Sequence, residues 1–316
     1  MRVVVIGFGS IGKRHVNNLI KMGFQDIILY REHSQGNNLG LTEIQDIEAV
    51  KELKPDFVIV SNPTSLHFRI LKFLIKNQLN ILCEKPLIDK REDWLQLKTY
   101  LNNYTGYARL VYNLRYHPCI IKVKEILSEN KIGKINFGRF FVGQYLPDWR
   151  PNSNHLESYS SRKEMGGGVI LDLVHEIDIA EYLINPPNID IHAIVNKISD
   201  VTINSEDIAE IIYKTTKNEI VNIHLDYLYR GYARNFLICG KEKNLTCDLF
   251  ENKVQISGDL NSKIETFEFS NFMQNDMYYN LLQDYIQGMK NPQINIKLPT
   301  FYDNESVLET CFKINN

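Results

Sequence analysis

Short apolar runs alternate with segments of helical period over the first part of the chain. The runs predict strands at Arg2–Ile6, Asp26–Tyr30, Phe57–Ser61, Asn80–Cys83 and Tyr107–Val111. Helical spacing is found between them, at Lys13–Met22, Ser65–Lys76 and Asp89–Leu101. Because strands that alternate with helices are typical of βαβ units, we expect an α/β fold with a doubly wound parallel sheet.

The pattern changes after residue 118, where strand-like runs dominate. A predicted helix at Cys119–Glu129 is followed by predicted strands at Ile135–Tyr145, Ile189–Ile198, Ile208–Lys214, Ile220–Tyr229 and Asn235–Gly240. One helix, Val169–Leu183, is predicted within this series. We therefore expect a first domain at residues 1–118 and a second, α+β domain at residues 119–316. The second domain should have a mostly antiparallel open sheet, and its last segment can pack back on the first domain.

Composition narrows the class of protein. The 316 residues have a formal net charge of -2, with 44% hydrophobic and 23% charged residues, which are globular proportions. A chain so close to neutral gives no reason to expect a nucleic-acid partner, and no apolar run approaches the ~18 residues that span a bilayer. The chain starts on a strand-like run rather than on a signal peptide, so we expect a cytoplasmic protein with no membrane partner.

The five cysteines are scattered along the chain. They form no Cys-x-x-Cys pattern and stand at no metal-ligand spacing with histidine, so we expect reduced, mostly buried thiols and no bound metal. A catalytic thiol is the alternative, and its position in the chain favours Cys83 for that role.

A glycine-rich loop follows the first predicted strand directly and leads into a predicted helix. Its residues are Gly7, Phe8, Gly9, Ser10, Ile11 and Gly12. In this context Gly7 permits a tight turn, Gly9 lets the backbone approach a pyrophosphate, and Gly12 lets the helix pack close to the strand. The N–H groups at the start of the helix then bind phosphate. We expect a dinucleotide here; an ordinary glycine-rich turn is the alternative.

The residue after the second predicted strand bears on the type of dinucleotide. An acid at this place usually binds the ribose 2′-OH of NAD, whereas this strand is followed by Arg31. A guanidinium suits a 2′-phosphate and can stack on adenine, so we expect NADP. NAD is the alternative, because Glu32 would hold its ribose if the strand ended one residue later.

Polar loops also follow the third and fourth predicted strands, at the sheet edge where the cofactor should extend. The first loop offers Ser61, Asn62, Pro63 and His67, and the second offers Glu84 and Lys85. A lysine here can hydrogen-bond the nicotinamide ribose and polarise a substrate hydroxyl or carbonyl through its charge. The alternative for Lys85 is a solvated surface lysine beside a glutamate.

The segment that follows three glycines at 166–168 carries a second group of polar residues. Helical spacing places Asp172 and His175 on one face, with Asp178 one step further along. A histidine titrates near neutral pH and can accept a hydroxyl proton as a hydride leaves the same carbon, and Asp172 can orient that imidazole or bind substrate. The alternative is a set of buried or capping polar groups. No third and fourth metal ligands stand at convincing spacing.

The segment 144–151 concentrates aromatic and hydrogen-bonding groups. Tyr145 and Trp149 suit the face and hydroxyls of a sugar, and Arg150 suits a substrate carboxylate or phosphate. The alternative is a loop that packs Trp149 onto the core.

Taken together, these motifs resemble the Gfo/Idh/MocA oxidoreductase family over essentially the whole chain. The resemblance is carried by the glycine loop, Glu84-Lys85-Pro86, the segment 112–118 and the segment 166–178. It implies a Rossmann domain followed by an α/β domain whose open sheet often forms the oligomer interface. It also implies that Lys85 is catalytic, that His175 is the acid/base with Asp172 beside it, and that Asn113 and Arg115 reach cofactor or substrate.

The expected activity is hydride transfer between NAD(P) and a secondary alcohol or ketone of a sugar, sugar derivative or nucleotide sugar, in a homodimer or homotetramer. We expect Lys85, Arg115, Tyr145, Trp149, Arg150, Asp172 and His175 to contact the substrate. Two alternatives stay open: a reductase of the same family with a dihydrodiol or tetrapyrrole substrate, and a non-catalytic regulatory protein that binds nicotinamide nucleotides.

Overall fold

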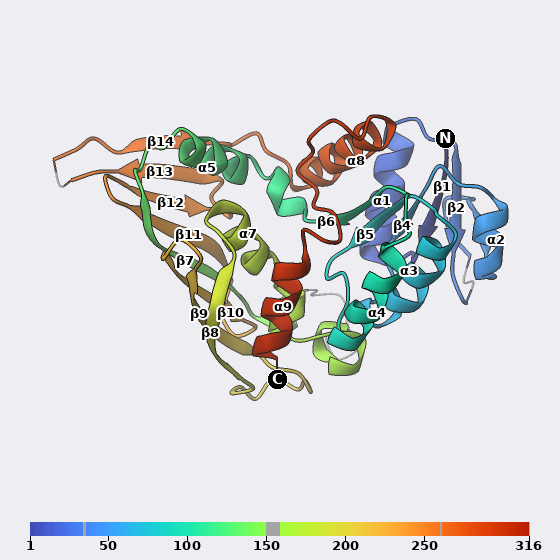
Figure 1. The fold of residues 1–316 in the computed structure, drawn as a ribbon, viewed down its shortest axis with the longest axis horizontal. Coiled ribbons are helices and arrows are strands. Elements are labelled where there is room, and N and C mark those ends of the chain that lie inside the picture. Colours follow the sequence, from blue (N-terminus) through green and yellow to red (C-terminus); the bar gives the residue numbers. More distant parts are fainter. Residues whose placement is uncertain (34–35, 150–158, 260, 316) are drawn as a thin grey trace. The chain divides into compact units, whose positions relative to one another are not determined.

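The computed structural model describes residues 1–33, 36–149, 159–259 and 261–315. The chain forms two compact units (Figure 1). The first unit contains Met1–Asn113 and Asn275–Asn304, and the second contains Leu114–Gln274 and Glu305–Asn316. The first stretch of the first unit thus ends at Asn113 rather than at residue 118, and a late segment of the chain returns to this unit before the last helix rejoins the second.

The first unit is built on a six-stranded parallel sheet in the order β3-β2-β1-β4-β5-β6. Its strands are β1 (Arg2–Ile6), β2 (Asp26–Tyr30), β3 (Thr42–Ile44), β4 (Phe57–Val60), β5 (Ile81–Glu84) and β6 (Ala108–Val111). Its helices are α1 (Ser10–Lys21), α2 (Ile47–Glu52), α3 (His67–Lys76), α4 (Arg91–Leu101) and α8 (Gln274–Lys290). The predicted parallel sheet is confirmed. The three-residue β3 and the short α2 were not predicted, because neither is long enough to show a period.

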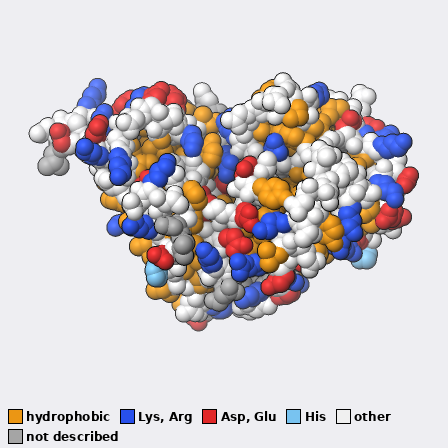
Figure 2. Space-filling view, in the orientation of Figure 1, with side chains coloured by type: hydrophobic (Ala, Val, Ile, Leu, Met, Phe, Trp, Pro, Cys, Tyr) orange, Lys and Arg blue, Asp and Glu red, His pale blue; other side chains and the backbone are white. Residues whose placement is uncertain are grey.

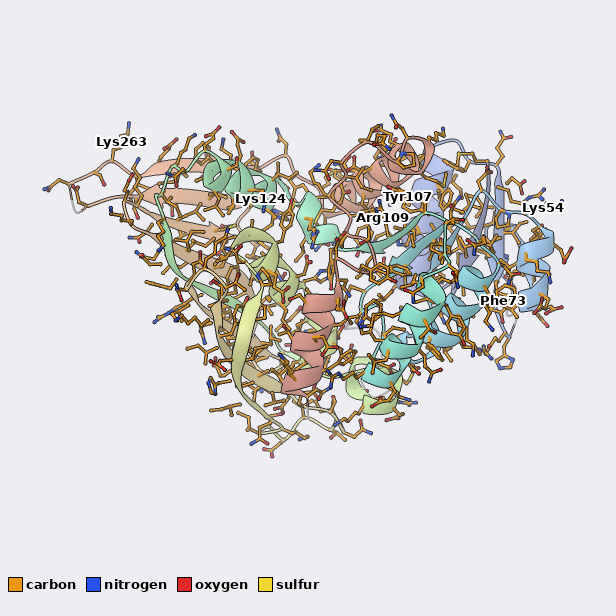
Figure 3. The ribbon with its side chains drawn as sticks, in the orientation of Figure 1. Lys54, Phe73, Tyr107, Arg109, Lys124 and Lys263 are labelled. Carbon is orange, nitrogen blue, oxygen red and sulfur yellow. The ribbon has the colours of Figure 1, made fainter. Side chains whose placement is uncertain are left out.

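Helix α8 belongs to the first unit because it packs on the aromatic end of β6. The Tyr285 ring lies 5.4 Å from that of Tyr107, and a Cβ at Gly288 would lie 2.1 Å from the Tyr107 hydroxyl, so the helix approaches closely. The Arg109 guanidinium carbon lies 4.1 Å from the centroid of the Tyr107 ring (Figure 3). The carbonyl of Pro299 accepts a hydrogen bond from the Leu110 N–H, which ties the segment after α8 to the edge strand.

The second unit is built on an eight-stranded, mostly antiparallel sheet in the order β14-β13-β12-β11-β7-β10-β9-β8, in which β7 and β10 pair in parallel. Its strands are β7 (Ile135–Gln144), β8 (Pro187–Asn196), β9 (Ile208–Thr215), β10 (Ile220–Asp226), β11 (Tyr232–Gly240), β12 (Asn244–Asp248), β13 (Lys253–Ser257) and β14 (Glu265–Glu268). Its helices are α5 (Pro118–Ser128), α6 (Val169–Asp172), α7 (His175–Leu183) and α9 (Glu305–Ile314), and they contact the sheet on one face (Figure 1). The predicted mostly antiparallel second sheet is confirmed.

Two predicted elements of the second unit were wrong in extent. The single helix Val169–Leu183 is divided into α6 and α7 at Leu173, and no glycine or proline marks the break. The strand predicted to run to Tyr229 ends at Asp226, because the Asp226 carboxylate accepts hydrogen bonds from the N–H groups of Leu228 and Tyr229 and turns the chain.

Candidate cofactor and substrate sites

The glycine loop has the geometry that binds a pyrophosphate. Gly7 has φ +88, and a Cβ there would lie 2.6 Å from the Asn62 nitrogen. A Cβ at Gly12 would lie 2.1 Å from the Gly7 carbonyl oxygen, so both positions need glycine. A Cβ at Gly9, in contrast, would meet nothing within 4 Å. Open space therefore adjoins the backbone where phosphate is expected, and the residues present fit a dinucleotide.

The start of α1 adds the electrostatic part of this site. Gly9 is the N-cap of the helix, no side chain caps the first turn, and this turn contains no acid. Its N–H groups and the positive end of the helix dipole are thus available to a phosphate. Ser10 is exposed at the first helical position, Ile11 is half-buried, and Phe8 is buried beside them.

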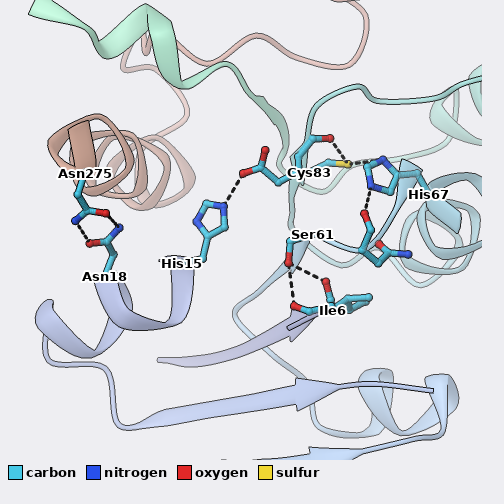
Figure 4. A network of polar contacts seen from close by, with 10 residues as sticks. Ile6, His15, Asn18, Ser61, His67, Cys83 and Asn275 are labelled. Atoms are coloured by element: carbon cyan, nitrogen blue, oxygen red, sulfur yellow. Dashed lines mark hydrogen bonds and ion pairs between the residues drawn. The ribbon is translucent and has the colours of Figure 1, made fainter. Parts of the chain in front are cut away.

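The loop after β4 is tied to the glycine loop and to the loop after β5 (Figure 4). The Ser61 hydroxyl lies 3.0 Å from the carbonyl oxygens of Ile6 and Gly7, which joins the ends of β4 and β1. The His67 ring is buried, with Nε2 3.0 Å from the Asn62 carbonyl and Nδ1 3.0 Å from the Pro86 carbonyl. Burial lowers the pKa of His67, and the neutral ring that this favours has a single N–H, which donates to one of these two carbonyls.

Glu84 and Lys85 follow at the end of β5, and Glu84 is held by a histidine that the sequence did not single out. His15 Nε2 lies 2.8 Å from Glu84 Oε1, and both side chains are buried (Figure 4). His15 is on α1, three residues after Gly12, among apolar side chains of the same helix. A buried histidine on an apolar helix face was the available signal, because such a ring requires a polar partner.

The cysteine beside this pair, Cys83, has the surroundings of a structural thiol, which the sequence predicted, rather than those of the alternative, a catalytic thiol. Cys83 is fully buried on β5, and burial raises the pKa of its thiol well above the ordinary value. A protonated buried thiol is unreactive, which agrees with the expected structural thiol.

Arg31 directly follows β2, because the strand ends at Tyr30 as predicted. Its Nη1 donates to the Gly36 carbonyl and lies 3.5 Å from Glu43 Oε1. Glu32 pairs with Arg69.

Asn113, the last residue of the first unit's opening stretch, is buried, with its amide nitrogen 3.9 Å from the Met277 sulfur.

In the second unit, Asp172 ends α6 and His175 begins α7, and both side chains are buried. The Tyr227 hydroxyl donates to Asp172 Oδ2 at 3.1 Å. The Trp149 ring meets the Tyr227 ring edge-on, with centroids 5.3 Å apart, while its Nε1 donates to the Gln144 carbonyl. Tyr227 therefore links two predicted substrate residues. The sequence offered a signal for this residue, because Tyr227 continues the alternating apolar positions of its predicted strand. A tyrosine at such a position is expected to be buried, and a buried hydroxyl needs a hydrogen-bond partner.

The first turn of α7 is held by two arginines from other elements. Arg115 Nε donates to Asp178 Oδ2 at 3.0 Å, and Arg234 Nε lies 2.8 Å from Glu176 Oε1. Burial raises the pKa of Asp178, and the Arg115 charge opposes that rise. The guanidinium of Arg115 is thus engaged with an acid beside His175, and it also lies over the Tyr182 ring. The sequence predicted the arginine but not this partner.

Tyr145 and Arg150 are the remaining predicted substrate residues. The Tyr145 ring carries the Arg230 guanidinium 3.6 Å from its centroid. Arg150 lies outside the described residues.

Among the residues with described positions, no cluster of three or more histidine, cysteine, aspartate or glutamate side chains could hold a metal. In the same part of the chain, no helix combines the length and the apolar character needed to cross a membrane.

Another carboxyl on α7 gives a testable pH effect. Burial raises the pKa of Glu181 from 4.5 to about 8, although Thr310 donates a hydrogen bond to it. The folded protein therefore holds a proton that the unfolded chain releases, so stability should fall as pH rises from about 5 to about 8. In the Glu181→Gln variant, the decrease in the free energy of unfolding between these pH values should be smaller by about 2 kcal/mol. This value is discounted for the partial exposure of the side chain. Urea unfolding of the wild type and the variant at the two pH values measures this difference. An equal decrease in the free energy of unfolding for both proteins would contradict the raised pKa of Glu181.

A parallel sheet in this strand order, with a glycine loop after its first strand, defines a Rossmann nucleotide-binding protein. The chain belongs to the GFO/IDH/MocA oxidoreductase family. The model described as "Oxidoreductase family, NAD-binding Rossmann fold" matches residues 1–107, and the GFO/IDH/MocA C-terminal domain matches residues 120–246. The predicted family is thereby confirmed.

Several curated relatives are named for reactions of sugars or polyols, and others are trans-1,2-dihydrobenzene-1,2-diol dehydrogenases of Xenopus. The chain is 24% identical to myo-inositol 2-dehydrogenase of Thermotoga maritima, over 92% of this chain and 89% of that protein. It is 29% identical to 1,5-anhydro-D-fructose reductase of Ensifer adhaerens, over 47% of this chain and 44% of that protein. The match to the uncharacterized oxidoreductase YrbE of Bacillus subtilis is 22% identical over 60% of this chain, and it spans 55% of that protein. The chain thus spans about half the length of several curated relatives.

Solved structures agree in fold. A levoglucosan dehydrogenase in complex with NADH superposes with a TM-score of 0.85 at 17% identity, covering 99% of this chain and 97% of that chain. UDP-N-acetylglucosamine 3-dehydrogenase from Acidithiobacillus ferrooxidans superposes with a TM-score of 0.79 at 18% identity, covering 99% of this chain and 96% of that chain. At these identities the likeness shows the fold alone.

Proposed function

We propose that the protein is an NAD(P)-dependent oxidoreductase that interconverts a secondary alcohol and a ketone on a sugar, a sugar derivative or a nucleotide sugar. The open cradle at Gly9, between two glycines that tolerate no side chain, carries the cofactor part of this proposal. The aromatic and acidic surroundings of Tyr227, together with relatives named for sugar and polyol substrates, support the substrate class.

When bound, the nicotinamide supplies the hydride chemistry. Lys85 places its ammonium on the reacting oxygen and stabilises the negative charge that develops there. His175 accepts the hydroxyl proton during oxidation and returns it during reduction. Asp172, oriented by Tyr227, binds a substrate hydroxyl next to this histidine. The glycine loop and the first turn of α1 hold the pyrophosphate, and Ser61 keeps that loop in register with β4.

Arg31 supports NADP as the preferred cofactor, with NAD as the alternative, because it directly follows β2, where the residue that recognises the ribose 2′ substituent is expected. Calorimetric titration with each cofactor tests this part, and failure to bind either one excludes the whole proposal. A panel of sugars, nucleotide sugars and aromatic dihydrodiols, followed by nicotinamide absorbance, tests the substrate class. Turnover of the dihydrodiols alone would contradict the sugar assignment.

We also infer a homodimer or homotetramer formed through the sheet face opposite α5, α7 and α9. Exposed isoleucines lie on strands of this sheet, among them Ile212, which is 45% exposed. Figure 2 shows hydrophobic side chains among basic and acidic ones on the visible face of the second unit. A second copy of the chain that covers these exposed apolar side chains removes them from water, which favours association.

The Ile212→Asp variant should therefore convert the oligomer to monomer in size-exclusion chromatography with light scattering, since a charge would be buried at the interface. Ile121→Asp is the matched control, because Ile121 is 41% exposed on α5 and lies away from this face. An unchanged mass for Ile212→Asp, or a monomeric wild type, would exclude this interface.

A further inference from the structure

An ion pair joins the end of β2 to the edge strand β3 in the first unit. Leu29 on β2 pairs in register with Glu43 on β3, and Arg31 follows two residues later. Arg31 Nη1 lies 3.5 Å from Glu43 Oε1, and the two side chains are only 18% and 9% exposed. The acid therefore stands beside the guanidinium expected at the ribose, in a place sheltered from solvent.

The loop between the two strands fixes the position of this acid. The Asn37 side-chain amide donates to Glu43 Oε1 at 2.8 Å and to the Leu41 carbonyl at 2.8 Å. Its oxygen accepts from the Leu41 N–H at 2.9 Å, so Asn37 ties the loop to the carboxylate. On the other side, Arg31 donates to the Gly36 carbonyl. Both members of the pair are thus held by backbone and side-chain contacts of one loop.

Arg31 is also connected to the phosphate end of the site. Its guanidinium carbon lies 5.9 Å from the centroid of the Phe8 ring, in the middle of the glycine loop. A cofactor whose pyrophosphate lies over Gly9 therefore directs its adenosine ribose toward the region of Arg31.

We propose that Glu43 sets the discrimination between NAD and NADP by opposing the charge of Arg31. This inference rests on the proposed binding of a nicotinamide cofactor. The two cofactors differ only in the 2′-phosphate, which carries about -1.5 to -2 charges at neutral pH. Arg31 attracts this phosphate and Glu43 repels it, whereas neither charge acts strongly on the neutral 2′-OH of NAD. Glu43 therefore weakens NADP binding selectively, and NAD remains a usable cofactor despite the arginine.

Glu32 is a matched control in the same loop. It is the next residue after Arg31, but it pairs with Arg69, and the two side chains are 41% and 63% exposed. Water and salt screen charges at such an exposed position, so its removal should affect the two cofactors nearly equally.

The experiment is calorimetric titration of the full chain with NAD and with NADP at low ionic strength. The Glu43→Gln variant keeps the shape of the side chain and an acceptor for Asn37, and it should raise the NADP-to-NAD affinity ratio about tenfold, chiefly through tighter NADP binding. This gain should shrink as salt is added. Glu32→Gln should leave the ratio within about threefold, and Arg31→Ala should lower it.

An unchanged ratio in Glu43→Gln, or equal gains for both cofactors, would overturn the inference, and so would an unchanged ratio in Arg31→Ala. If Glu43→Gln is not folded by circular dichroism, Glu43→Ala removes the same charge and is read in the same way. A wild type that binds neither cofactor would refute the proposed function, whereas a wild type that binds with no response at position 43 would refute only this inference.

Discussion

The Lys85→Ala variant should lose at least about 10³-fold in kcat while its affinity for the nicotinamide cofactor changes less than about threefold. Removal of the ammonium leaves the negative charge on the reacting oxygen without its principal partner. The loop itself should survive, because it is held by other contacts: Glu84 binds His15 at 2.8 Å, and His67 lies 3.0 Å from the Pro86 carbonyl. Steady-state rates and calorimetry on the same preparations separate the loss of turnover from a loss of cofactor binding.

Lys90→Ala is the control for this prediction. Lys90 lies five residues further along the chain, is exposed, and is the N-cap of α4. Its replacement should leave kcat within about twofold, since a solvated charge contributes little. Lys85→Arg keeps the positive charge and should recover part of the lost rate. Near-normal turnover in Lys85→Ala would exclude Lys85 from the chemistry.

The second large effect is expected for His175→Ala, which should lower kcat about 10²- to 10⁴-fold and remove the dependence of alcohol oxidation on a basic group. His175 begins α7 and is buried, and the acids one and three residues after it pair with Arg234 and Arg115. These pairs should keep the helix in place when the imidazole is removed. Profiles of kcat/KM against pH for both proteins measure the effect: the wild type should lose activity at low pH, and the variant should show no such limb.

His192→Ala serves as the matched histidine control, because His192 is exposed on β8. It should keep both the wild-type rate and the low-pH limb. If His175→Ala retained that limb, another group would be the base.

The Tyr227→Phe variant tests whether Tyr227 positions Asp172 for substrate binding or takes part in the chemical step. Loss of its hydrogen bond to Asp172 should raise KM more than it lowers kcat.

Local signals were sufficient where a residue's conformation depends on its neighbours in sequence. The strand Arg2–Ile6 and the glycine loop after it were predicted because an apolar run and a required left-handed turn are both local features. The long helix across 169–183 failed for the opposite reason. Its residues have helical propensity, but the break after Asp172 coincides with polar contacts to residues far along the chain.

The short elements were missed for a related reason. A strand such as Thr42–Ile44 is too brief to show alternation, and it forms because β2 offers it backbone partners. That pairing places Glu43 beside Arg31, so the acid that bears on cofactor choice was absent from the sequence reasoning.

The sequence by itself determined the parallel first sheet, the place of the phosphate cradle and the candidate residues Lys85, Asp172 and His175, because period, glycine positions and residue chemistry are properties of short segments. The tertiary structure alone decided the partners: Glu84 with His15 across 69 positions, Asp172 with Tyr227 across 55, and Asp178 with Arg115 across 63. Buried polar groups must find hydrogen bonds, but only the folded backbone brings residues this distant together and selects which ones meet.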